Sequence, residues 1–217
     1  MFNKKITALF LTLVMSMVTS IGAFAAPSGT EIEINIESSE AEVFIPSEMS
    51  PEEKQVYYES IEKQVELTSQ KYGANFNKDL FRNELIFVLE TDNSFKKIQS
   101  RDYNNIMPFA GTWIPDIKVK NDIAAAAINV AIDLALVSTG VGTVAAYVKK
   151  VGLKEARKLF TSTLTTKLKA WGLGALAVSL PVAVDFVFNL LNPGAKIAEY
   201  LDSVDSYPNN GYLDIIL

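Results

Sequence analysis

The chain has 217 residues, of which 25 are acidic, 20 are basic and none is cysteine or histidine. These two absences exclude disulfides, thiolate nucleophiles, imidazole bases and zinc sites with His or Cys ligands. The formal net charge of −5 argues against nucleic acid as a partner.

The first 25 residues have the pattern of a secretory signal peptide. Lys4 and Lys5 form the charged start, residues 6–18 form the apolar stretch, and Ala23-Phe24-Ala25 supplies the cleavage site. We expect cleavage after Ala25, because a cut after Ala26 would put Phe24 where a small residue is needed. The secreted chain then has 192 residues (217 − 25), enough for one large domain or two small ones. Export without cysteine suits a Gram-positive bacterium.

Charge is shared unevenly along the secreted chain. Residues 26–112 hold 16 acids and 8 bases (net −8), whereas residues 113–217 hold 9 acids and 10 bases (net +1). Residues 100–120 contain Pro108, Gly111 and Pro115 without a sustained period, which indicates a connector. We therefore predict an acidic region (26–112) and an apolar and basic domain (113–217). The acidic half either stays solvated or masks the basic part.

The acidic region predicts two helices. Ser50-Pro51-Glu52-Glu53 has the pattern of a capping box, and Gly73 ends that helix. A second helix follows Asn77 and stops near Thr91; its apolar residues recur at spacings of three and four, namely Leu80, Phe81, Leu85, Val88 and Leu89. Before both helices, residues 30–37 alternate like a short strand, with a poorly ordered lead-in as the alternative.

The second half consists of two apolar runs around a basic stretch. Residues 123–148 and 170–195 are 26 residues each, and each has one charged side chain, Asp133 or Asp185. We expect Asn121 or Asp122 to cap the first apolar helix, and Pro181 to interrupt the second run. We also expect breaks at Gly140 to Gly142, Gly152 and Asn192 to Gly194, and a short helix after them. Between the runs a single acid, Glu155, faces seven bases: Lys149, Lys150, Lys154, Arg157, Lys158, Lys167 and Lys169.

The apolar runs permit a helical bundle or entry into a membrane. A permanent span needs about 20 apolar residues, and the glycines and Pro181 leave shorter pieces. Each run also has a polar line, a row of polar residues along one helix face. We expect these lines to be partly exposed to solvent, while the other residues of the runs form the core. In a second, membrane-bound state, the basic helix would lie on anionic lipid with Trp113 and Trp171 at the interface, although core packing is the commoner role of a tryptophan. Asp133 and Asp185 would then need to protonate, pair or line water, which predicts acid-sensitive or oligomeric insertion. The lines are Asp122, Asn129 and Asp133, and Asp185, Asn189 and Asn192.

The C-terminal tail contains Asp, Asn and Gly residues like those of a calcium-binding loop. If Gly211 takes the glycine position of an EF-hand, the first, third and last ligands fall on Ser206, Pro208 and Leu217. We therefore expect a tight turn at Asn210-Gly211 and a strand over 212–217, paired with residues 32–36. The predicted fold is mostly α with minor terminal β structure. No catalytic, metal or cofactor site is predicted.

One segment resembles a known toxin family. Residues 137–152 read VSTGVGTVAAYVKKVG, an apolar Gly- and Ala-rich helix ending in paired lysines, and the next lysine-bearing helix ends in Trp171. This segment resembles the helical circular bacteriocins. The overall plan resembles the precursors of sporulation-delaying toxins and the streptococcin-type bacteriocins. These families imply secretion, killing of related bacteria and action at the cell membrane. Circular bacteriocins are much shorter and sporulation-delaying toxin has a cysteine pair, so no residue role is carried over.

Two functional hypotheses follow. The first is a secreted bacteriocin-like protein that acts at target bacterial membranes through its C-terminal apolar and basic helices. Its partners are an anionic membrane surface or the bacterial cell envelope, an immunity protein in the producer, and further copies on the membrane. The second is a non-lytic secreted interaction or lipid-binding module. We do not expect an enzyme, because the remaining carboxylates, lysines, tyrosines and hydroxyls form no catalytic arrangement.

Overall fold

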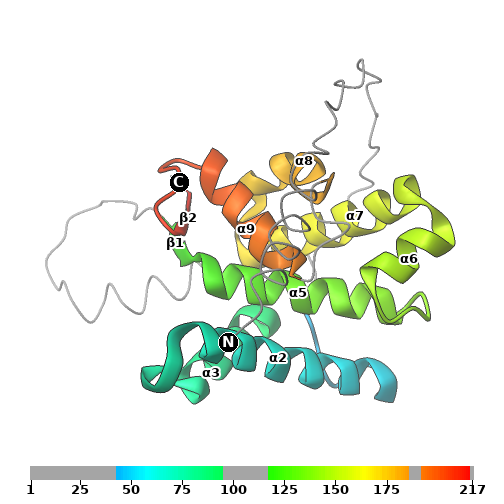
Figure 1. Cartoon of the computed structure of the whole chain (residues 1–217), viewed down its shortest axis with the longest axis horizontal. Helices are drawn as coiled ribbons and strands as arrows, with labels where there is room; N and C mark the ends of the chain where they lie inside the picture. The colour runs from blue at the N-terminus through cyan, green and yellow to red at the C-terminus, as the bar shows by residue number, and fades with distance from the viewer. Residues whose placement is uncertain (1–42, 95–116, 186–191, 216–217) are drawn as a thin grey trace, which may run out of the picture. The chain divides into compact units, whose positions relative to one another are not determined.

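The computed structural model describes residues 43–94, 117–185 and 192–215. Most of these residues are helical, and a two-stranded antiparallel sheet accompanies the helices, which confirms the mostly α prediction with minor β structure (Figure 1). The predicted signal peptide, the alternating stretch 30–37, Trp113 and Asn189 lie outside the described residues.

The two helices of the acidic region begin and end at their local signals. Helix α2 (Pro51–Tyr72) has the predicted capping box between Ser50 and Glu53 and ends at Gly73. A short 3-10 helix, η1 (Gly73–Asn75), leads to α3 (Lys78–Glu90). The Asn77 side chain accepts a hydrogen bond from the amide of Leu80 at 2.9 Å and caps α3. Both predicted helices are confirmed, because their caps depend only on neighbouring residues.

Helices α2 and α3 pack against each other through apolar side chains. Ile61 and Val65 of α2 and Leu85 of α3 are fully buried. The Tyr57 hydroxyl donates to Glu90 at 2.8 Å, and burial of this hydroxyl raises the pKa of Tyr57 well above its ordinary value. Leu80 was predicted on the apolar side of α3, but 63% of it is exposed.

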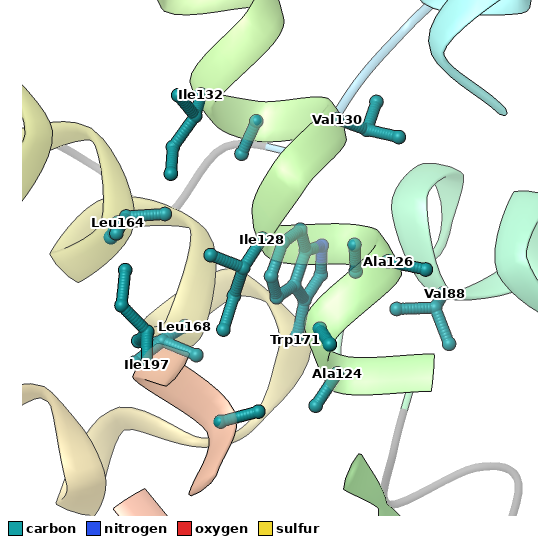
Figure 2. Packing of buried hydrophobic residues seen from close by; sticks show 14 of the residues in the cluster. Val88, Ala124, Ala126, Ile128, Val130, Ile132, Leu164, Leu168, Trp171 and Ile197 are labelled. Carbon is teal, nitrogen blue, oxygen red and sulfur yellow. The ribbon is translucent and has the colours of Figure 1, made fainter. Parts of the chain in front are cut away.

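Helix α5 (Asn121–Val137) is the central element of the described fold, and 12 of its 17 residues are buried. Helices α2 and α3 lie on one side of it, and α7 and α9 lie on the other (Figure 1). Figure 2 shows Val88 of α3 on one side of α5, and Leu164 and Ile197 on the other. A helix that is apolar nearly all round is stable in water only when other elements surround it. The part of the first apolar run that ends at Val137 is thus the core helix of a bundle.

The start of α5 differs from the prediction. Neither Asn121 nor Asp122 caps the helix: both lie within it, and Lys120 occupies the cap position without a side-chain hydrogen bond. The side-chain amide of Asn121 donates to the Asp202 carboxylate at 2.7 Å, while the carboxylate of Asp122 accepts from Lys71 and Tyr72. The side chains of Asn121 and Asp122 therefore bind distant residues of the fold instead of capping the helix.

The glycine and proline breaks divide the remaining chain into short helices. Helix α6 (Val144–Val151) and helix α7 (Leu153–Trp171) meet at Gly152, as predicted. The second apolar run forms a 3-10 helix, η2 (Gly174–Ser179), and helix α8 (Leu180–Asp185). Pro181 lies in the first turn of α8, where its missing N–H leaves no helical bond unmade. Asn192 caps helix α9 (Pro193–Val204).

The predicted C-terminal strand exists and pairs with a strand that the sequence did not predict, while its expected partner, residues 32–36, lies outside the described residues. Strand β2 (Tyr212–Ile215) pairs antiparallel with β1 (Ile117–Lys120), with Val119 opposite Leu213. We expected residues 32–36 to fill this role and assigned 117–120 to a connector. Four residues are too few for a periodic signal in the sequence. Strand β1 leads directly into α5 and lies beside the turn at Gly211. The carbonyl oxygen of Gly211 accepts a hydrogen bond from the backbone amide of Asn121.

The two helices of the acidic region, α2 and α3, pack on the rest of the fold. Residues from α2, α3, α5, α7 and α9 belong to one hydrophobic cluster. Backbone bonds add to this contact: the Asn93 amide donates to the Ala170 carbonyl at 2.6 Å. The acidic helices are therefore part of the same core as the apolar runs.

Among the described helices, none combines the length and the apolar character that crossing a membrane requires.

The contact between α5 and α9 predicts the effect of one substitution. A Cβ added at Gly194 would lie 2.2 Å from the Ala125 carbonyl oxygen and 2.7 Å from the Asn129 side chain. Gly194→Ala should therefore lower the free energy of unfolding by about 3 kcal/mol, measured by urea denaturation. Gly142→Ala is the control, since a Cβ there meets nothing within 4 Å. Equal losses in the two variants would contradict the close approach of α9 to α5.

Candidate functional site: a cationic helical hairpin

The exposed lysines of the second half gather on the hairpin formed by α6 and α7. Lys149 and Lys150 lie in the last turn of α6, and Lys154 and Lys158 lie four residues apart in the first half of α7. All four are exposed. Positions four apart share a helix face, so α7 presents two ammonium groups on one side next to the pair on α6.

Local sequence determines the shape of this hairpin. Thr143 caps α6 by accepting from the Ala146 amide at 3.2 Å. Gly152 joins the two helices with a φ of 86°, a conformation that a side chain would strain. The chain therefore reverses direction within one residue, which keeps the lysines of the two helices close together.

These lysines have few partners. No ion pair to Lys149, Lys154 or Lys158 occurs among the residues that the structure describes. The ammonium group of Lys150 donates to the Thr139 carbonyl at 3.1 Å. Four positive charges thus face solvent, and the one acid among them, Glu155 in the first turn of α7, is exposed and forms no ion pair within the described residues.

The remaining basic residues take other roles. Arg157 pairs with Asp185 at 2.5 Å, and the ammonium group of Lys167 lies 3.8 Å from the centre of the Phe44 ring. Lys169 is exposed at the far end of α7. Trp171 is fully buried in the core of this fold, whereas its expected position at a lipid interface concerns the membrane-bound state.

The polar line of α5 faces α2, and its two acids keep the partial exposure that we expected, since the side chains of Asp122 and Asp133 are each 27% exposed. Asp133 accepts from the Ser60 hydroxyl at 2.8 Å and pairs with Lys63 at 3.5 Å. Asn129 is buried and donates to Gln64 at 2.9 Å. Asp122 pairs with Lys71 at 2.8 Å. The whole line faces α2, because α2 presents hydrogen-bonding side chains at matching helical spacing.

The pKa of Asp185 is raised in the folded protein. Partial burial raises the pKa of Asp185 above its ordinary value of 3.8, and the charge and hydrogen bond of Arg157 oppose this rise. Asp185 and Arg157 thereby join α8 to α7 behind the lysine face. The other acids of the described segments form no group of three placed to hold a metal ion.

Helix α6 is the least buried helix of the hairpin. None of its residues is fully buried, and Val144, Tyr147, Val148 and Val151 pack only partly against the core. Tyr147 contacts Phe160 of α7 edge to face, with ring centroids 6.0 Å apart. Few buried apolar contacts mean a low free energy of local opening, so α6 can separate from α7 more readily than α5 from its neighbours.

Sequence reasoning missed the partners of the α5 polar line. Ser60, Lys63, Gln64 and Lys71 follow one another at spacings of three, one and seven, which places them on one side of α2. Two helices with complementary polar lines are a signal for pairing, but such lines also occur on solvated helices. Only the observed contacts separate the two cases.

No protein-family model, curated protein or solved structure matches this chain.

The pairing of Asp185 with Arg157 predicts a pH-dependent effect on stability. Because the pKa of Asp185 is raised in the folded state, its ionisation opposes folding as pH rises through that pKa, and Arg157 reduces the penalty. Arg157→Met should therefore destabilise the fold more at pH 7 than at a pH below the folded-state pKa of Asp185. Urea denaturation at several pH values measures this difference.

Lys158→Met is the matched control, since it removes a neighbouring positive charge that has no ion pair in the described residues. Its effect should vary little with pH. An Arg157→Met effect that is constant across pH, or larger in acid, would contradict the assigned pairing.

Proposed function

We propose that this chain is a secreted bacteriocin-like protein that acts at anionic bacterial membranes, with the α6 and α7 hairpin as its membrane-binding surface. The observation that carries the proposal is the group of four exposed lysines, Lys149, Lys150, Lys154 and Lys158, on the least buried part of the fold. The resemblance of residues 137–152 to circular bacteriocins and the signal-peptide pattern of the first 25 residues support it.

Charge alone supplies weak binding. Each basic residue near an anionic surface contributes about 1 kcal/mol, so four lysines supply about 4 kcal/mol. That corresponds to a dissociation constant of about 1 mM. Salt screens this attraction, and a second, apolar contribution is needed for stable attachment.

Helix α6 offers this apolar contribution. Its partly buried side chains Val144, Tyr147, Val148 and Val151 now face α7 and the core. If α6 swings out, these residues enter the lipid while the lysines at its end stay at the headgroups. Leu153, at the start of α7, is already 49% exposed and lies between Val151 and Lys154.

Helices α2 and α3 have a different role in this proposal. Asp122 and Asp133 of α5 bind α2 through Lys71, Ser60 and Lys63, which holds the apolar core helix between other helices. Release of α5 into a membrane would break these contacts and bury both acids, at a high energetic cost. Membrane binding through α6 is therefore the first step, and insertion of α5 requires the separation of α2. An immunity protein in the producer and oligomers on the membrane remain parts of the proposal.

Removal of the four lysines tests the proposal. The chain that begins at Ala26 is mixed with vesicles of phosphatidylglycerol and phosphatidylcholine, and binding is measured by co-sedimentation. The variant K149Q/K150Q/K154Q/K158Q should bind at least tenfold more weakly, because it loses the attraction to anionic headgroups. Binding of the unchanged chain should fall steeply with added salt.

A second quadruple variant, K54Q/K78Q/K169Q/K196Q, serves as the control because it changes the net charge equally but on α2, α3, α9 and the far end of α7. It should bind like the unchanged chain. Equal losses in both variants would show a general effect of net charge and contradict the hairpin as the binding surface. Dye release from the same vesicles separates the two functional hypotheses: binding by the folded chain without release contradicts the lytic function and favours a non-lytic lipid-binding module.

A further inference from the structure

A cleft of about 490 Å³ lies at the opposite end of α5 from the lysine hairpin. One wall comes from the end of α2, η1 and the start of α3, and the other from the β1 to α5 junction and the start of β2. Its volume is in the range of small-molecule sites, roughly 300–1,000 Å³. Its lining combines aromatic and aliphatic side chains with carboxylates, amides and a lysine.

An exposed and immobilised aromatic ring dominates the cleft. Tyr72 is 52% exposed, yet its hydroxyl donates to the Asp122 carboxylate. Its ring stacks on Phe76 with an interplanar angle of 12° and a centroid distance of 5.9 Å. The Asp122 carboxylate raises the pKa of the Tyr72 hydroxyl, which keeps the hydroxyl protonated and donating. The Lys71 ammonium also lies 5.1 Å from the ring centre, so the ring is held in place and loses little entropy when a ligand packs against its exposed part.

Two further large side chains are exposed at the cleft. Leu80 is 63% exposed and Tyr212 is 38% exposed, and each lines the cleft. Phe81 and Ile123 form a buried apolar floor. The cleft therefore offers flat apolar faces on several sides, which suits a ligand that itself has a flat apolar face.

The charges of the cleft select against an ionic ligand. Asp122 and Glu84 are balanced by Lys120 in the lining and by Lys71, which pairs with Asp122 at 2.8 Å. Lys71 lies outside the lining, but because it neutralises Asp122, the lining has no net charge that would attract an anion or a cation. Carboxylate, amide and hydroxyl groups such as Asp122, Asn75 and Thr68 instead suit a neutral ligand with many hydroxyl groups.

We propose that this cleft binds a neutral glycan, with a sugar ring stacked near Tyr72 and its hydroxyls bound by the polar lining. The C–H face of a pyranose carries partial positive charge and is attracted by the negative face of an aromatic ring. The site goes beyond the proposed membrane function and does not depend on it. Since α5 has 17 residues and is about 25 Å long, the glycan site and the lysine hairpin can be occupied at the same time.

The experiment uses the chain from Ala26 and isothermal titration calorimetry with three neutral tetrasaccharides: maltotetraose, cellotetraose and the tetramer of N-acetylglucosamine. Tetragalacturonate and tetraglucosamine are the anionic and cationic comparisons. At least one neutral sugar should bind, and both charged sugars should bind at least tenfold more weakly. Tyr72→Ala should weaken binding of the neutral sugar at least tenfold, while its far-UV circular dichroism remains unchanged.

Tyr58→Ala is the matched control, since Tyr58 is a 47% exposed tyrosine on the same helix but outside the cleft lining. Its affinity should stay within twofold. Leu80→Ala, a second exposed position of the cleft, should also weaken binding and keeps the test valid if Tyr72→Ala does not fold. The proposal is overturned if no neutral sugar binds at about 10 mM, if a charged sugar binds as well, or if Tyr58→Ala loses as much affinity. The lysine variants should keep sugar binding and Tyr72→Ala should keep vesicle binding, so the two proposals fail separately.

Discussion

The described fold depends on the buried side chain of Asn129. Its amide donates to Gln64 of α2 at 2.9 Å and to Asn192 at the start of α9 at 2.8 Å, and its carbonyl oxygen accepts from the Gly194 amide at 2.8 Å. Three segments distant in sequence thus meet at one polar group. Each buried polar group left without a partner would cost about 1–3 kcal/mol, so this network strongly favours one arrangement of the three helices.

This junction explains how so apolar a helix is accommodated in water. The run of alanines from Ala124 to Ala127 lets neighbouring helices approach α5 closely, and Gly194 permits the backbone of α9 to reach the Ala125 carbonyl. The polar line of α5 then faces α2, where Asn129 is buried and the two acids are partly exposed. Because the polar line is used in helix pairing, the apolar remainder of α5 is free to contact α3, α7 and α9.

The acidic and basic parts of the chain consequently have separate tasks. The acidic helices cover the core helix, although most of their ion pairs are exposed and contribute little, as for Arg82 with Glu62. The α6 and α7 hairpin lies at the end of α5 away from β1 (Figure 1). Its lysines are exposed to solvent. In our proposals, this end binds anionic membranes and the cleft beside Asp122 binds a glycan. One core helix would then connect recognition of a cell surface with attachment to its membrane.

The sequence by itself determined the elements whose signals are local: the capping box of Ser50 and Glu53, the cap at Asn77, and the helix ends at Gly73 and Gly152. It also determined which residues carry the positive charge of the hairpin. Only the tertiary structure decided that β1 is the partner of β2, that Asp122 binds α2 and that Trp171 is buried. The cleft was equally invisible in the sequence, since Tyr72 and Tyr212 are 140 positions apart (212 − 72). Caps and turns depend on neighbouring residues, whereas pairing and burial depend on which distant segment makes the better contact.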